Sequence, residues 1–162
     1  MAGIGRFRDN FNYQHLHKAQ RVFTNAEVQA WPTTTPELVA AYPNQIIIPS
    51  MVVYDFPNWV ADYSNIDGSA KIKLEIDGGT DFASLSPTFD PAAVLAQGKS
   101  IVLWTDIGRD FDYNPIPRAD MLGKGWDLAV TNASAGNFTL GDPSDLITVT
   151  VFYYLIPGGI YQ

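Results

Sequence analysis

The sequence predicts an all-β protein, an antiparallel β-sandwich with jelly-roll connectivity. About seven or eight short runs of β-branched and aromatic residues follow one another along the chain, with almost no helical periodicity between them. The longest such run, residues 146–156, contains only Thr, Val, Ile, Leu, Phe and Tyr. The chain has no cysteine, so neither a disulfide framework nor a cysteine-ligated metal organises it. We therefore expect one domain held together by a packed core.

Residues 146–156 should form a strand in the middle of a sheet, because both of its faces carry apolar side chains. One face is apolar throughout and consists of Ile147, Val149, Val151, Tyr153 and Leu155. The other begins with two threonines and ends with Phe152 and Tyr154. Aromatic side chains in this position are expected to be covered by another part of the chain or by another copy of it. Phe152 and Tyr154 are therefore candidate interface residues.

Residues 1–21 read as an extended N-terminal arm on a domain formed by residues 22–162. Four basic residues and one acidic residue give the arm a charge of +3, whereas 6 basic and 16 acidic residues give the domain −10. Phe7, Phe11 and Tyr13 supply the arm with apolar anchors, so we expect it to order on a partner. The alternative is a frayed chain end. An acidic domain argues against nucleic-acid binding, and no apolar run is long enough for a membrane span.

The remaining elements follow from local patterns. Thr24 and Glu27 have the spacing of a capping box and predict one helical turn that stops at Pro32. Pro49 predicts a bulge or a sheet edge. A second short helix is expected within residues 90–98. The other expected strands are residues 37–41, 46–48, 51–56, 71–77, 100–104 and 126–131, with Ile72, Leu74, Ile76, Trp126, Leu128 and Val130 facing inward.

The candidate chemical sites are weak. Asp110, Asp112 and Asn114 have the spacing of the first ligands in a calcium loop, but Pro115 stands where that loop requires glycine. An acidic, solvated loop is the better interpretation. His15 and His17 have a spacing compatible with metal binding, without a third ligand. We expect no catalytic residue, cofactor or metal, although paired loop carboxylates leave glycan hydrolysis as a remote possibility.

Two further features bear on binding. Residues 106–125 form a connection longer than usual, which predicts an exposed contact loop at one end of the sandwich. Trp59, Trp104 and Trp126 suggest sugar stacking, although tryptophans also occupy cores and interfaces. A carbohydrate- or receptor-binding fibre head is therefore the main alternative function.

Several segments together resemble small virion proteins of tailed bacteriophages. The resemblance rests on residues 22–28, residues 33–41 with their Thr-Thr-Pro, the Ile-Pro of residues 46–49, and the Gly-Asp turn of residues 136–142 before the closing strand. It spans residues 22–156, departs from the pattern at Tyr42 and does not cover residues 106–125. It implies a jelly-roll capsid decoration (cement) protein, often trimeric, bound outside the head and without a catalytic motif.

The sequence thus predicts a non-enzymatic virion structural protein that self-associates, with a homotrimer expected, and decorates or stabilises a phage capsid. Its expected partners are further copies of itself and the major capsid protein or another virion protein, with no nucleic acid and no membrane. We expect it to be made in the host cytoplasm and to lie on the capsid exterior.

Overall fold

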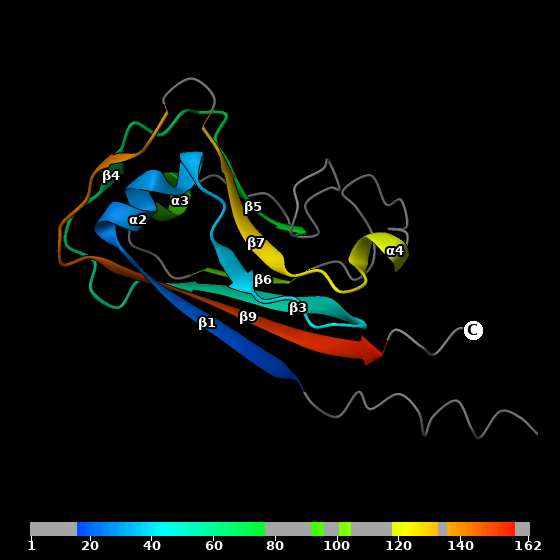
Figure 1. Cartoon of the computed structure of the whole chain (residues 1–162). Helices are drawn as coiled ribbons and strands as arrows, with labels where there is room; N and C mark the ends of the chain where they lie inside the picture. Colours follow the sequence, from blue (N-terminus) through cyan, green and yellow to red (C-terminus); the bar gives the residue numbers. More distant parts are fainter. Residues whose placement is uncertain (1–15, 77–91, 96–100, 105–117, 133–135, 158–162) are drawn as a thin grey trace, which may run out of the picture.

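The computed structural model describes residues 16–76, 92–95, 101–104, 118–132 and 136–157. Within them, a four-stranded sheet faces a three-stranded sheet, and a separate two-stranded pair lies at one end (Figure 1). Every strand pair is antiparallel. The predicted all-β sandwich is therefore confirmed, whereas its jelly-roll connectivity stays a prediction.

The four-stranded sheet contains the longest strands. Its order is β1 (His17–Thr24), β9 (Leu146–Pro157), β3 (Gln45–Asp55) and β6 (Ile101–Trp104). The β9 strand pairs with β1 along one side and with β3 along the other, as expected for a central strand. Ile147, Val149, Val151 and Tyr153 are buried, which confirms the predicted inward face.

The other elements are shorter. The three-stranded sheet has the order β2 (Glu37–Val39), β7 (Trp126–Thr131) and β5 (Lys71–Ile76), and β4 (Tyr63–Ser64) pairs with β8 (Thr139–Leu140). The helical segments are α2 (Asn25–Ala30), the 3-10 helix η1 (Trp31–Thr33), α3 (Ala92–Leu95) and α4 (Arg118–Met121).

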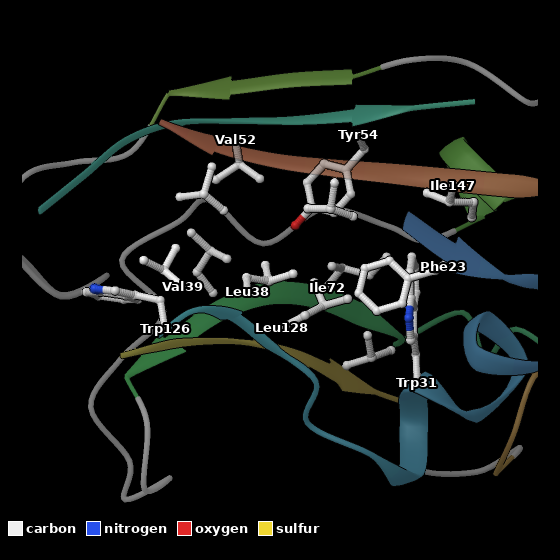
Figure 2. Packing of buried hydrophobic residues seen from close by; sticks show 14 of the residues in the cluster. Phe23, Trp31, Leu38, Val39, Val52, Tyr54, Ile72, Trp126, Leu128 and Ile147 are labelled. Carbon is white, nitrogen blue, oxygen red and sulfur yellow. The ribbon is translucent and has the colours of Figure 1, made fainter. Parts of the chain in front are cut away.

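The core fills the space between the two larger sheets. Figure 2 shows Tyr54 and Ile147 from the four-stranded sheet facing Ile72 and Leu128 from the other. All six positions predicted to face inward in β5 and β7 are buried. The indole Nε1 of Trp126 donates a hydrogen bond to the carbonyl of Ile47 at 3.2 Å, which ties the two sheets together.

Two local predictions are confirmed at the level of hydrogen bonds and register. The hydroxyl of Thr24 accepts a bond from the Glu27 amide, and the Glu27 carboxylate accepts one from the Thr24 amide at 2.9 Å, so the capping box is complete. Residues 45–55 form one strand with a register shift between Pro49 and Met51, which is the predicted bulge. Pro32 does not end helical structure at once, because it lies in η1.

The boundary expected for the arm at residue 21 is wrong. His17–Thr24 form β1 and pair with β9 over their whole length, so the four-stranded sheet begins five residues before the expected domain. The sequence did not reveal this strand because only alternate side chains turn inward, and two of those, His17 and Arg21, are polar. The possible arm therefore shortens to the residues before β1, of which residues 1–15 lie outside the described part.

The connection expected over residues 106–125 also differs in its second half. It contains α4, and Leu122 forms an isolated bridge with Ile46. Met121 is buried, and Gly125 lies so close to the backbone of Val39 that an added Cβ would meet its carbonyl oxygen at 2.5 Å. This half is packed against the domain. Residues 105–117 lie outside the described part, so the contact-loop prediction for them remains untested.

Candidate assembly surface

The four-stranded sheet turns one face toward the core and the other away from it. The outward face, here called the outer face, includes Lys18, Gln20, Val22, Met51, Val53, Asp55, Thr148, Thr150, Phe152 and Tyr154. The strand register sets these side chains in rows across the sheet. In the part of the chain that the structure describes, all other elements lie on the opposite side of this sheet (Figure 1).

The outer face changes character across its width. Phe152 lies between Lys18 of β1 and Met51 of β3, and Thr150 lies between Gln20 and Val53. The amide of Gln20 donates to the hydroxyl of Thr150 at 3.3 Å, so both side chains lie on the same face of the sheet. The outer face is thus mixed: β1 contributes the polar Lys18 and Gln20, and the apolar side chains of β9 and β3 gather around Phe152 and Met51.

The structure thus places Phe152 and Tyr154, the two predicted interface residues of β9, on the side of the sheet away from the core. Both are half-buried. Large aromatic side chains in such a position favour contact with another surface, since their exposed area is removed from water when two proteins associate. The other predicted interface residues, Phe7, Phe11 and Tyr13, lie outside the described residues.

An aromatic cluster fixes the start of β1. His17 stacks on Tyr153 with ring centroids 5.4 Å apart, and the hydroxyls of Tyr153 and Tyr42 lie 3.1 Å apart. Burial, together with the hydrogen bond to Tyr42, raises the pKa of Tyr153 well above its usual value. The Tyr153 hydroxyl is therefore neutral near pH 7. The point at which residues before β1 leave the domain is therefore fixed.

A hollow of about 230 Å³ lies where β1 passes into α2, beside Trp31. Arg21 occupies its rim, where its guanidinium lies 4.8 Å from the Phe23 ring centroid, donates to the Glu37 carbonyl at 3.0 Å and pairs with Glu27 at 3.5 Å. The charged groups of this hollow thus satisfy one another. Their arrangement anchors the helix to the sheet.

At the same end, two aliphatic side chains are exposed, one in the segment before β4 and one in β8. Val60 is 62% exposed and Leu140 is 65% exposed. The sequence does not single out either residue. Leu140, for example, is a lone leucine before Gly-Asp, which is an ordinary residue next to a turn. Their segments, together with Asp62, Gly141 and Asp142, are called the β4–β8 tip below.

The tryptophans considered for sugar stacking have structural roles where the structure describes them. Trp126 is 1% exposed, so its ring face is closed to a ligand. Trp59 packs on Phe56 and Tyr63, and its Nε1 donates to Asp62 at 3.2 Å. The side chain of Trp104 lies outside the described part.

Most of the weak metal candidates lie outside the described residues. Asp110, Asp112 and Asn114 lie outside the described residues, as does His15. Within the described ranges, no three histidine or acidic residues come together as ligands for an ion. No helix among these residues is long and apolar enough to cross a membrane.

Comparisons with known proteins add one likeness. No protein-family model matches the chain, and no curated protein matches it. A solved structure of the capsid of Ralstonia phage GP4 is similar to it, with a TM-score of 0.39, 10% sequence identity and coverage of 86% of this chain and 83% of that chain. At this score and identity, the likeness does not establish a shared fold or function.

Proposed function

We propose that the protein is a non-enzymatic virion structural protein that self-associates and decorates or stabilises the capsid of a tailed phage. The observation that carries the proposal is the outer face of the four-stranded sheet, where Phe152, Tyr154 and Met51 stand away from the core. The sequence resemblance to small phage virion proteins supplies the kind of assembly to which such a surface belongs.

A homotrimer is the proposed state of association. The apolar half of the outer face gives each copy an interface core, and its polar β1 margin resembles the rim of a protein interface. The arm before β1 adds Phe7, Phe11 and Tyr13, which gain stability only when a neighbouring surface buries them. Exposed ion pairs contribute at most about 1 kcal/mol each, so these apolar contacts must dominate.

A position on the capsid exterior follows from charge. Residues 22–162 carry −10, so a surface facing packaged nucleic acid would be repelled by the phosphates. The proposed partner is the major capsid protein or another exterior virion protein, and synthesis takes place in the host cytoplasm. No step of this function requires a cofactor.

The alternative of a carbohydrate- or receptor-binding fibre head receives less support. Of its three candidate tryptophans, Trp126 is enclosed by the core and Trp59 is engaged with its neighbours. Quantitative mass spectrometry of purified virions separates the two functions. Hundreds of copies per particle are expected for a decoration protein, whereas a few to tens would indicate a fibre or tail component and overturn the proposal.

A further inference from the structure

Leu140 has a backbone conformation that an ordinary leucine avoids. Its φ is +62°, in the left-handed region that favours glycine and asparagine, and its side chain is 65% exposed. The fold gains neither burial nor a relaxed backbone from leucine here, so asparagine or glycine would fit better. Strain of this kind persists where the surroundings determine the backbone, and it is concentrated at functional positions.

The surroundings do determine this backbone. The side-chain amide of Gln29 donates to the Leu140 carbonyl at 2.7 Å, and the amide of Gly141 donates to the Asp62 carbonyl at 3.2 Å. Gly141 has a φ of +72°, and an added Cβ would lie 2.7 Å from Asn25 Oδ1 and from the Tyr63 ring. The turn therefore holds the Leu140 side chain outward.

A buried carboxylate brings Val60 to the same place. The two oxygens of Asp145 accept hydrogen bonds from the amides of Val60 at 2.7 Å and Asp142 at 2.8 Å. Because one carboxylate binds both amides, the two segments are neighbours. The β4–β8 tip thus presents two exposed aliphatic side chains on a rigid support.

Two acidic residues belong to the same two segments, Asp62 two residues after Val60 and Asp142 two residues after Leu140. Asp62 is exposed, and Asp142 accepts hydrogen bonds from the amide and hydroxyl of Ser144. These bonds lower the pKa of Asp142, so it stays ionised at neutral pH. A fitting partner therefore carries an apolar side chain between two cations.

The chain itself contains that pattern in Arg6-Phe7-Arg8. We propose that the β4–β8 tip is the docking site for this segment of a neighbouring copy, with Phe7 covering Val60 and Leu140 and the arginines facing the two aspartates. The inference rests on the self-association proposed above and specifies which surface receives the arm.

Chain geometry favours a neighbouring copy over the same chain. The tip lies beside Asn25, just after the end of β1, whereas the arm leaves from the start of β1 at His17. The eight residues of β1 span about 26 Å. Ten fully extended residues reach at most about 35 Å, so Phe7 would reach its own tip only by reversing direction and running straight back along β1.

An arm on a neighbour's tip joins two unlike surfaces. Such heterologous contacts form a closed ring when the rotation between copies is right, and a trimer is one such ring. The outer face and the arm would then contribute to the same assembly.

The test is sedimentation equilibrium of the full-length chain and its variants. Leu140→Asn should weaken association at least tenfold without lowering the melting temperature, because asparagine tolerates the left-handed backbone. Phe7→Ala should weaken it comparably, and the double variant no further, since both changes remove one contact. Ala40→Ser, at an exposed position outside both the tip and the outer face, is the control and should leave association unchanged.

The outcomes separate the two proposals. A wild-type chain that is monomeric at micromolar concentration overturns self-association and this inference together. A wild-type oligomer whose affinity is unchanged by Leu140→Asn overturns the docking site alone. Additive effects of Leu140→Asn and Phe7→Ala would also overturn it, because the two residues would then act at separate places.

Discussion

Asp145→Ala is expected to be one of the most destabilising single changes at the β4–β8 end of the molecule. The side chain is 1% exposed, and its carboxylate binds the amides of Val60 and Asp142. A hydrogen bond to a charged group contributes about 1.5–3 kcal/mol, and both amides would lose their acceptor. We therefore expect the free energy of unfolding to fall by about 3–5 kcal/mol. In a chain of this size, that corresponds to a melting temperature lower by about 10 °C.

The assay is urea and thermal unfolding followed by circular dichroism. Asp145→Asn keeps one acceptor oxygen and should lose roughly half as much stability. Asp142→Ala is the comparison variant, because it removes the same charge from the same turn. Its carboxylate is half-buried and accepts bonds from Ser144 within the turn, so it should cost clearly less than Asp145→Ala. A loss below about 1 kcal/mol in Asp145→Ala would refute the view that this carboxylate holds the two segments together.

Three further predictions test other parts of the structure. The hydrogen bond from the amide of Thr24 lowers the pKa of Glu27 below its usual 4.5. The difference in unfolding free energy between the wild type and Glu27→Gln should therefore be constant near neutral pH and shrink as pH falls through that lowered pKa. A difference that does not change with pH in acid titrations would contradict this prediction. Gly125→Ala should cost about 2 kcal/mol or more in chemical unfolding, because its Cβ would meet the Val39 carbonyl; an unaffected midpoint would show that this approach is looser. Tyr154→Asp should reduce self-association in light scattering while leaving the unfolding midpoint nearly unchanged. An intact oligomer would show that the interface lies elsewhere.

Much of the sandwich could be predicted because its strands have strong local patterns. In β5, alternation places Ile72 and Leu74 inward, and period-two patterning identifies a strand whatever its neighbours are. The capping box and the bulge after Pro49 are likewise local, since each depends on residues adjacent in sequence. These features required no knowledge of tertiary structure.

Other features depend on contacts between distant segments. The start of β1 was missed because His17 and Arg21 occupy inward positions and find their partners only in the tertiary structure, His17 on Tyr153 and Arg21 at the Glu37 carbonyl. The packed half of residues 106–125 was missed for a similar reason, since the short apolar pair Met121-Leu122 belongs to no helical or strand periodicity in the sequence.

The candidate surfaces show the same division. Phe152 could be placed on the outward face of β9 by alternation alone. The β4–β8 tip could not be placed in this way, because its geometry depends on contacts between segments that are far apart in sequence. Gln29 binds the Leu140 carbonyl, and Asp145 binds the Val60 amide. Exposure of a leucine and a left-handed backbone leave no mark in composition or periodicity.

The corrected start of β1 changes how the arm should be removed. A chain beginning at Val22 would lose five residues of β1 and leave part of β9 without its partner strand. A chain beginning at Leu16 keeps β1 whole and is the proper truncation. It should retain its fold and lose association, and unchanged assembly would show that the arm is a frayed end.

The most direct test of self-association is multi-angle light scattering of the purified full-length chain at micromolar concentration. The account predicts a single species with about three times the chain mass of 17.8 kDa. A stable monomer of one chain mass under these conditions would contradict it.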